Sequence, residues 1–568
     1  WIEIHKDQFK RLGVIGDWNN PYSTMDFESE AVISEEFLSL VNKGVVYRGS
    51  KPVMWSPVEK TALAEAEIEY REHLSTTIWV KFPIAFGSLK GASVVIWTTT
   101  PWTIPSNKGV AFNSKISYGL YKVLKTEKEC WAEADELLLF ADTLADACLR
   151  QSRVVEYERV SDVSTSTLAG ISLLHPFHGI EAADGFWDYE VPVFDGEYVT
   201  EDTGTGFVHT APSHGAEDYD AFVALGWTDR MTHNVNEDSS FANTVPFFSG
   251  KQVYDKKGKE GKANSEIIQK LIETGSLLAR GRLRHSYPHS WRSKAPVIFR
   301  NTQQWFVAID RDLEDGLNKY GKNIRDRALT SIDNLVKWTP PSGRNRLFSM
   351  ISSRPDWVLS RQRAWGVPLT CFLKRGANPS DADFILKDPS VNERISKIFA
   401  LEGADAWFEK GAKERFLCGL QNPNDYDQVF DILDVWFDSG STHAFVLRDR
   451  QDGGWPADLY LEGTDQHRGW FHSSLLQSCG TKGFAPYKGV LTHGFTLDEK
   501  GIKMSKSQGN AVSPDQVIKQ YGADILRLWV AQSDYTSDLR IGPEILKGVS
   551  DSYRRLRNTL RFLLGSLT

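Results

Sequence analysis

The chain has 568 residues, of which 41% are hydrophobic and 25% charged, a balance typical of globular proteins with several domains. No run of about 18 apolar residues predicts a membrane span, and no signal-peptide pattern opens the sequence. The formal net charge of −8 does not indicate a nucleic-acid binder, so any RNA contact must come from a local patch. The five cysteines form no Cys-x-x-Cys pair, which favours a reducing compartment over a disulfide framework.

Residues 1–52 contain two helical patterns separated by a turn at residues 17–21. The second pattern places Ile33, Phe37 and Val41 on one face and ends near Gly44. From about residue 53 to 295 the sequence changes to short β-rich runs punctuated by Gly and Pro, which predict a β-rich domain. We expect strands over residues 76–82, 93–97, 191–194 and 206–209.

Residues 296–530 mix strand and helix patterns around an irregular insertion at about 371–425. The later part alternates a strand at 431–437, a helix after Gly469, a strand at 489–493 and a helix at 514–521. This alternation predicts an α/β fold with a parallel sheet, interrupted by the β-rich domain, and a ligand at the carboxyl ends of the strands. Residues 531–568 are assigned to a helical domain. Because residue 1 is Trp and the last residues remain in a helical pattern, we expect both ends to be cut.

The stretch KMSKSQGN at residues 503–510 places two ammonium groups three residues apart, among hydroxyls. Lys503 and Lys506 can act as point charges on phosphate oxygens, and Ser505, Ser507 and loop N–H groups add donors. Such a loop would stabilise the charge that builds on a pyrophosphate leaving group. A Lys-x-x-Lys pair alone is more often a solvated pair in a turn, so the assignment depends on the rest of the sequence.

Four further blocks accompany this stretch: WVLSRQRAWG at residues 357–366, DVWFDSGS at 434–441, YLEGTDQHRGWF at 460–471 and THGF at 492–495. Together they closely resemble the class I aminoacyl-tRNA synthetases of the isoleucyl type, bacterial or organellar, along essentially the whole chain. The resemblance implies a Rossmann-like catalytic domain, an inserted editing domain and the start of an anticodon-binding domain. The family's upstream His-x-Gly-His motif and its amino-group anchor are absent from these residues, which implies that the chain alone is deficient in activation.

The resemblance also assigns an activation site. Trp436 and Trp470 would wall an apolar pocket, and Glu462 and Gln466, if helical, would share one face beside it. These four side chains are implied to hold isoleucine or its adenylate. ATP, with Mg²⁺, is implied to contact Lys503, Met504, Ser505, Lys506, Ser507, His493 and Gly494, with Lys503 and Lys506 catalytic. The residues alone leave an alternative open for each group. Trp436 and Trp470 could be packed in a core, Glu462 and Gln466 could be a solvated surface pair, and His493-Gly494 could be an ordinary turn.

Two blocks in the β-rich region carry chemistry of their own, the hydroxyl-rich residues 98–107 and the histidine- and acid-rich residues 209–219. A metal site from His209, His214 and Asp218 matches no standard zinc spacing, and His214 fits a structural histidine better. The resemblance implies a hydrolytic editing site lined by Thr98, Thr99, Thr100, Asn107, His209 and Asp218, in which Asp218 binds the ammonium group of a misattached amino acid.

Many relatives carry cysteine pairs where this chain has Ser56 and Glu59, and Ser290 and Ser293. All four cysteines are absent together, so we predict no zinc in the insertion, and no metal among the site residues. At the other end of the chain, Arg554, Arg557 and Arg561 share one helical face, which is either solvated or in contact with tRNA.

The leading hypothesis is ATP-dependent ligation of isoleucine to tRNA(Ile), with hydrolysis of valyl errors. One apolar methylene discriminates by only about 1–3 kcal/mol, for which the isoleucyl enzyme is itself a standard example, so a second pocket is needed. The alternatives are a chain competent only as an editing deacylase or tRNA-binding module, or a valyl- or leucyl-type synthetase. We expect a cytoplasmic monomer with no membrane partner, or one in an organellar matrix.

Overall fold

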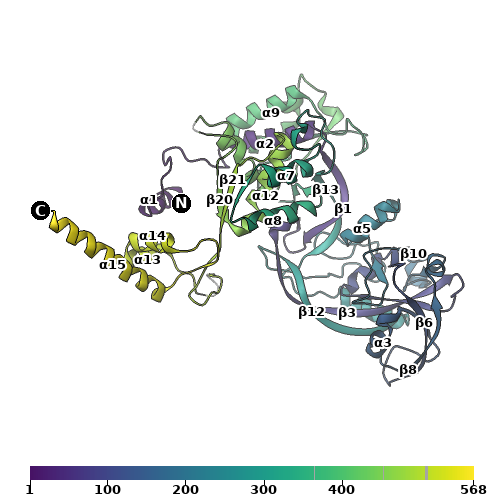
Figure 1. Cartoon of the computed structure of the whole chain (residues 1–568). Coiled ribbons are helices and arrows are strands. Elements are labelled where there is room, and N and C mark those ends of the chain that lie inside the picture. Colours follow the sequence, from purple (N-terminus) through teal and green to yellow (C-terminus); the bar gives the residue numbers. More distant parts are fainter. Residues whose placement is uncertain (364, 452, 506–508, 568) are drawn as a thin grey trace. The chain divides into compact units, whose positions relative to one another are not determined.

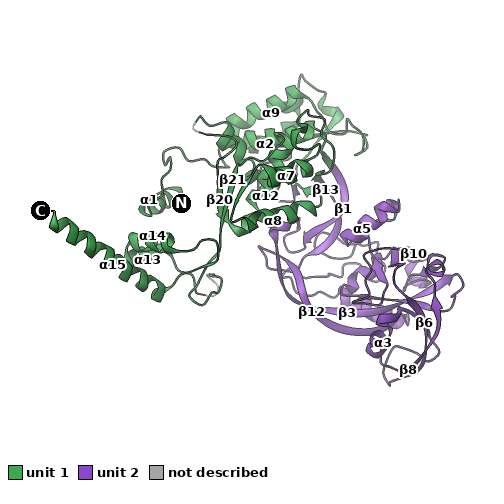
Figure 2. Ribbon diagram, viewed as in Figure 1, with its two compact units in different colours: residues 1–47, 306–359, 364–568 green, residues 48–305, 360–363 purple. Residues whose placement is uncertain are grey.

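The computed structural model describes residues 1–363, 365–451, 453–505 and 509–567. The chain divides into two compact units (Figure 2). Unit 1 comprises residues 1–47, 306–359 and 364–568, and unit 2 comprises residues 48–305 and 360–363. The chain passes between them within β1 (Val46–Ser56) and again within β13 (Ile298–Val307). Unit 2 is therefore a long insertion into the sequence of unit 1.

Unit 2 is built on one ten-stranded mixed sheet, all of which lies within the described residues. Its longest strands, β3 (Ile68–Phe86) and β12 (Leu277–Ser290), pair antiparallel over most of their length. The other strands are β4 (Ser93–Thr98), β5 (Gly109–Phe112), β6 (Tyr118–Thr126), β7 (Leu137–Ala141), β8 (Val154–Val163), β9 (Ser172–Leu174), β10 (Glu190–Asp195) and β11 (Val208–Thr210). The helices are α3 (Asp142–Gln151), α4 (Thr165–Ala169), α5 (Ala216–Ala224) and α6 (Ala263–Glu273).

The core of unit 2 follows from alternation along these strands. Val95, Tyr121, Leu138 and Phe140 are buried in one cluster with Leu149 of α3. Apolar residues at every second position face this cluster, and burial of each large apolar side chain contributes about 1.5–3 kcal/mol. The predicted β-rich character of this region is confirmed.

In the described part of unit 1, the strands β14 (Lys337–Thr339), β21 (Gly489–His493) and β20 (Tyr460–Gly463) form a parallel sheet in that order. The surrounding helices include α2 (Phe27–Asn42), α7 (Ile324–Asn334), α8 (Ser342–Ser352), α9 (Pro389–Glu402) and α12 (Trp470–Thr481) (Figure 1). Glu462 pairs in register with Thr492, and Gly463 with His493. The carboxyl ends of β20 and β21 therefore meet at one edge of the sheet. The expected mixed α/β fold is confirmed.

The C-terminal part of unit 1 is helical, as predicted, with α13 (Pro514–Tyr521), α14 (Ala523–Gln532) and α15 (Pro543–Ser566). Val517, Ile525, Trp529 and Leu546 form its core, and Met504 packs against them. The short parallel strands β22 (Thr496–Leu497) and β23 (Leu539–Arg540) join this part to the segment after β21. At the other end of the chain lies α1 (Ile2–Arg11). None of the helices in the described residues is long and apolar enough to cross a membrane.

Two local predictions are wrong. Residues 371–425 are not irregular, because they contain α9, α10 (Ala412–Leu417) and the strand β17 (Phe372–Lys374), which pairs with β18 (Tyr426–Gln428) just beyond them. The start of α9 is capped by the Asp388 carboxylate, which accepts from the Ser390 N–H at 2.8 Å, and Val391, Ile395 and Phe399 fall on one buried face.

The second wrong prediction is the strand at residues 431–437. The strand β19 is only Ile432–Leu433, because the Asp434 carboxylate accepts from the Trp436 N–H at 3.2 Å and caps the helix α11 (Val435–Gly440). A short-side-chain acid before an apolar run is a helix start signal, and here it overrides the β propensity of the residues beside it.

Candidate functional site

The edge where β20 and β21 end brings together most of the residues predicted for activation. Glu462 lies on β20 and is exposed, and His493 is the last residue of β21. A Cβ on Gly463 would lie 3.6 Å from Cε1 of His493, so the two strand ends approach closely. The His493 Nδ1 lies 2.8 Å from the carbonyl oxygen of Gly494 and donates to it, because a carbonyl oxygen can only accept.

Trp470 is held in one orientation by three kinds of contact. Its ring stacks on Tyr460, with centroids 4.0 Å apart and planes 4° from parallel. Its Nε1 donates to the Ser439 carbonyl at 3.1 Å and to the Thr442 hydroxyl at 3.0 Å, and its backbone N–H donates to Oε1 of Gln466 at 2.9 Å. The indole is half-buried, so it borders a surface instead of filling the core.

Trp436 and Gln466 meet at Gly469. A Cβ on this glycine would lie 2.8 Å from the Trp436 ring and 2.6 Å from Oε1 of Gln466, so no side chain fits between them. The Trp436 Nε1 is buried and makes no hydrogen bond within the described residues. A buried donor without a partner costs about 1–3 kcal/mol, so this N–H is a candidate ligand contact.

The geometry corrects one expectation about this pocket. Glu462 and Gln466 do not share a helical face, because Glu462 belongs to β20 and Gln466 to a 3₁₀ turn, Thr464–Arg468. The glycine-containing segment after the strand turns the chain before α12 begins. Both residues nevertheless lie near the same strand end.

The described part of the 503–510 loop is organised by Asn510. Its Oδ1 accepts from the Ser505 N–H at 2.9 Å, and its Nδ2 donates to the Asp498 carboxylate at 3.0 Å and to the Lys503 carbonyl at 3.2 Å. The Lys503 side chain is exposed. Lys506 and Ser507 lie outside the described residues. Asn510 was not predicted as a site residue, although Asn directly after Gly is a turn signal that could have indicated it.

Gly494 allows the segment at residues 535–538 to approach the strand edge. A Cβ at this position would lie 2.2 Å from the carbonyl oxygen of Ser537, and the Gly494 N–H donates to the Tyr535 carbonyl at 3.0 Å. The absence of a side chain at Gly494 therefore permits a close backbone approach to another part of the chain.

In unit 2 the predicted editing residues form a connected hydrogen-bond network. His209 Nδ1 lies 2.7 Å from the Asn107 Nδ2, and His209 Nε2 lies 2.9 Å from the Thr103 hydroxyl. That hydroxyl also lies 3.3 Å from the hydroxyl of Thr100, which in turn lies 3.1 Å from that of Thr98. Thr99 is half-buried beside them.

This network fixes the tautomer of His209. The amide nitrogen of Asn107 can only donate, so Nδ1 accepts and the proton resides on Nε2. Burial lowers the pKa of His209 to about 3, which keeps the ring neutral. Thr103, which the sequence did not indicate as a site residue, connects His209 to Thr100. Its hydroxyl donates to the Thr100 carbonyl at 2.8 Å.

Asp218 lies in the first turn of α5, where its Oδ2 accepts from the Ala211 N–H at 2.8 Å. Ala211 lies two residues after His209, so this bond ties Asp218 to the segment that carries the histidine. Burial raises the pKa of Asp218 to about 6. An ammonium group beside this carboxylate would lower the pKa again and gain a strong charge-assisted hydrogen bond.

His214 is a structural histidine, as the residues suggested. Its Nδ1 lies 3.0 Å from the Phe299 carbonyl and its Nε2 lies 3.2 Å from the Ser106 hydroxyl. Burial lowers its pKa to about 4. Among the described residues there is no group of three side chains placed to hold a metal ion.

The Glu59 carboxylate joins the turn at Ser56 to the turn at Ser290 and Ser293. Glu59 Oε1 accepts from the Ser290 hydroxyl at 2.7 Å and from the Ser293 N–H at 2.9 Å, and the Glu59 N–H donates to the Ser56 hydroxyl at 3.2 Å. These hydrogen bonds connect the two turns.

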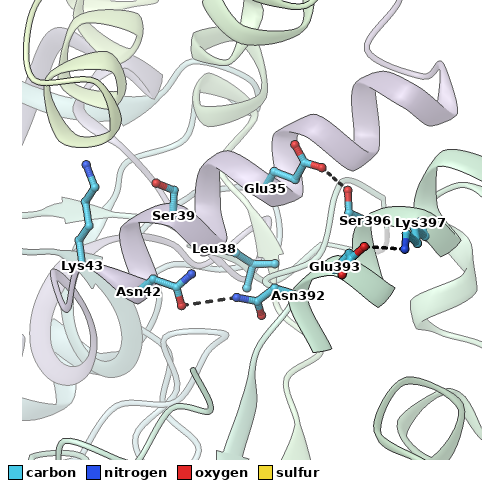
Figure 3. Close-up of a pocket in the computed structure, with 9 residues that line it drawn as sticks. All are labelled: Glu35, Leu38, Ser39, Asn42, Lys43, Asn392, Glu393, Ser396 and Lys397. Carbon is cyan, nitrogen blue, oxygen red and sulfur yellow. Dashed lines mark hydrogen bonds and ion pairs between the residues drawn. The ribbon is translucent and has the colours of Figure 1, made fainter. Parts of the chain in front are cut away.

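A hollow between α2 and α9 does not have the character of a site (Figure 3). Most of its polar groups are paired with each other, Asn42 with Asn392, Glu393 with Lys397, and Glu35 with Ser396. Such a surface leaves no converging polar groups for a ligand.

Comparison with known protein families shows which family the chain belongs to. The protein-family model described as tRNA synthetases class I (I, L, M and V) matches residues 1–542 of the sequence. The chain therefore belongs to this family.

Over its whole length the chain is 62% identical to the isoleucine–tRNA ligase of Ruegeria pomeroyi and 55% identical to that of Rhodopseudomonas palustris. It spans 59% and 58% of the lengths of these curated relatives. A solved LeuRS–tRNA–LeuAMS complex of Agrobacterium radiobacter K84 aligns with 98% of this chain and 63% of its own, at 15% identity and a TM-score of 0.40.

Proposed function

We propose that the protein to which this chain belongs joins isoleucine to tRNA(Ile) with consumption of ATP, and that unit 2 hydrolyses valyl errors. The observation that carries the first part is the strand edge where Trp436, Gln466 and Trp470 are held against one another beside the ends of β20 and β21. Ligands of open parallel sheets bind at such an edge. The identity to isoleucine–tRNA ligases supports isoleucine as the substrate.

In the activation step the isoleucine carboxylate attacks the α-phosphate of ATP, and pyrophosphate leaves. The two indoles would enclose the branched side chain, and the Trp436 Nε1 and the Gln466 side chain would supply polar contacts. Lys503 and Lys506 would place positive charge where the pyrophosphate leaves, and Ser505, Ser507, His493 and Gly494 would border the nucleotide. Mg²⁺ would accompany ATP as part of the substrate.

In editing, the Asp218 carboxylate would bind the ammonium group of the misattached valine, and Thr98, Thr99, Thr100 and Asn107 would line the pocket. His209 is neutral and bonded at both nitrogens. We therefore assign it to orienting Thr103 and Asn107 instead of moving a proton. The Glu59 hydrogen bonds support an insertion that folds without zinc. We further infer a cytoplasmic monomer.

Pyrophosphate exchange in the intact protein tests the first part. Exchange should depend on isoleucine and should fall at least about 100-fold in Lys503→Ala, because a charge on the leaving group is then unpaired. Lys500→Ala, a few residues earlier in the same segment, is the matched control and should retain activity. Exchange that prefers leucine or valine over isoleucine would move the assignment to another branch of the family.

The alternative, an editing deacylase without activation, is favoured by the complete hydrogen-bond network in unit 2. It predicts hydrolysis of Val-tRNA(Ile) by a protein that shows no isoleucine-dependent exchange. Measuring both activities on the same preparation separates the two functions.

A further inference from the structure

The helix α15 begins without a cap of its own. Its N-cap residue is Gly542, which has no side chain to accept a hydrogen bond, and Pro543 follows at the first helical position. The N–H groups of a first helical turn find no acceptors within the helix. Here the acceptor comes from a distant part of the sequence, because Oε1 of Glu499 accepts from the Glu544 N–H at 2.7 Å and from the Ile545 N–H at 3.4 Å. The carboxylate also lies at the positive end of the helix dipole.

The space that Glu499 occupies at the start of α15 is provided by Gly542. A Cβ on this glycine would lie 1.9 Å from Cγ of Glu499, and the three atoms nearest to that Cβ position all belong to the Glu499 side chain. The backbone of Gly542 is extended, with φ 175° and ψ 177°. Glycine therefore serves here to admit Glu499, and not to adopt a left-handed conformation.

Glu499 stands in a tight turn that also holds the loop at residues 503–510. The Asp498 N–H donates to the Ile502 carbonyl at 3.0 Å, and the Asp498 carboxylate accepts from the Ile502 N–H at 2.8 Å. The same carboxylate accepts from Nδ2 of Asn510 at 3.0 Å. Of two consecutive residues in this turn, Asp498 thus binds the loop and Glu499 binds α15.

The backbone of Lys503 is attached to the same turn. Lys503 forms a β-bridge with Leu497, and its carbonyl accepts from Asn510 at 3.2 Å. Leu497 pairs in register with Arg540 of β23, two residues before Gly542. Residues 496–503 therefore form one short hairpin, to which both the start of α15 and the backbone of Lys503 are joined.

We propose that Glu499 is a positioning residue for the activation step, because it fixes this hairpin to the start of α15 and so holds Lys503 in place. Glu499 touches no substrate in this assignment and acts through Asp498 and Asn510. The inference rests on the proposed function for the reaction that Lys503 serves. A displacement of about 1 Å in a group that positions a reactant costs up to about 100-fold in rate, so the link should be measurable in kcat.

Isoleucine-dependent pyrophosphate exchange by the intact protein tests the inference. Glu499→Ala should lower kcat about 10-fold and leave the KM for isoleucine within about twofold, because the contacts that hold Trp470 lie elsewhere. Glu499→Gln keeps an oxygen that accepts from the helix N–H groups and should restore most of the rate. Glu544→Gln is the matched control, since it removes an exposed negative charge from the first turn of α15 and leaves the Glu499 contact intact. An unchanged kcat in Glu499→Ala would overturn the inference.

A second cap separates positioning of the loop from simple stabilisation of α15. Glu499→Ala vacates the space beside Gly542, so Gly542→Ser can be added to it, and serine is a strongly preferred N-cap residue. The double variant Glu499→Ala/Gly542→Ser should recover the melting temperature that Glu499→Ala loses. It should not recover kcat, because the new cap has no bond to the hairpin. Recovery of kcat together with the melting temperature would show that Glu499 serves only the stability of the helix, and the inference would fail.

Amide hydrogen exchange gives an answer that does not depend on the reaction. The Ser505 N–H donates to Asn510 at 2.9 Å, so a peptide covering residues 498–505 reports whether the loop is held. Its amide exchange should be at least about threefold faster in Glu499→Ala and in the double variant than in the parent protein, and unchanged in Glu544→Gln.

The two kinds of measurement separate failure of this inference from failure of the proposed function. Parent-like amide exchange in Glu499→Ala would reject the link even if its activity fell. Faster amide exchange in Glu499→Ala, combined with a parent protein that shows no isoleucine-dependent pyrophosphate exchange, would uphold the link and reject the proposed function.

Discussion

Single residues in this protein acquire their chemistry from neighbours that are far away in sequence. His209 is neutral because burial and Asn107, about a hundred positions earlier, fix its protonation. The sequence indicated the threonines, Asn107, His209 and Asp218 through resemblance. It did not indicate Thr103, because a hydroxyl in a hydroxyl-rich segment carries no local signal of which partner it will meet. That the Trp436 Nε1 has no hydrogen-bond partner among the described residues can likewise be recognised only in the folded structure.

Asp218 should control the pH dependence of deacylation. Its pKa is raised to about 6, so the carboxylate that would bind ammonium forms as pH rises through that value. After subtraction of the uncatalysed rate, kcat/KM for Val-tRNA hydrolysis should rise to a plateau above about pH 6. Asp218→Asn should lower the plateau at least about 10-fold and remove the rise. Asp220→Asn, at an exposed position of the same helix, is the control, and an unchanged profile in Asp218→Asn would exclude the assigned role.

The Asp218 carboxylate should also lower the stability of the native state as pH rises. A raised acid pKa means that the native state holds the proton more tightly than the unfolded state, so stability falls as pH rises from about 4 through about 6. Thermal unfolding of Asp218→Asn should therefore match that of the parent chain near pH 4 and exceed it above pH 6. A lower melting temperature of the variant at pH 8 would contradict this sign.

At the scale of elements, the sequence predicted which helices and strands exist better than it predicted where they begin and end. The helix at 514–521 and the strand at 489–493 match α13 and β21, because their periodicity and their flanking Pro and Gly are strong signals. The expectation for residues 431–437 failed because a single capping side chain ended the strand. The strands β14, β21 and β20 lie in one sheet, although β14 precedes the other two by more than a hundred residues in the sequence. No local sequence pattern specifies that pairing.

The loop at 503–510 should depend on Asn510. Asn510→Ala removes three hydrogen bonds, each worth about 0.5–1.5 kcal/mol, that hold Lys503 and Ser505 to the Asp498 turn. We expect kcat of isoleucine-dependent pyrophosphate exchange to fall about 10- to 100-fold with little change in the KM for isoleucine. Asn510→Asp keeps the acceptor for Ser505 and should lose less. A change confined to the KM for isoleucine would place Asn510 in amino-acid binding.

At the scale of the whole chain, two compact units have separate cores, and the long β-rich insertion was visible as a change in composition along the sequence. The domain roles assigned to those regions remain predictions.

Unit 2 should fold without zinc because Glu59 joins its two turns. Glu59→Ala should lower the free energy of unfolding by about 1–3 kcal/mol, since a buried hydroxyl and an N–H lose a charged acceptor. Glu190→Ala, on an exposed position of β10, is the control. Chelators should leave the melting temperature unchanged, and elemental analysis of the purified chain should find no zinc in unit 2. Stoichiometric zinc there would refute the prediction.

The close backbone contact at Gly494 limits which mutations the gene can tolerate. The carbonyl of Ser537 occupies the space that any side chain at position 494 would need. Every missense change at this codon therefore inserts atoms between the sheet edge and the segment that leads into α15. In a saturation library selected for growth, glycine should be the only residue recovered at this position.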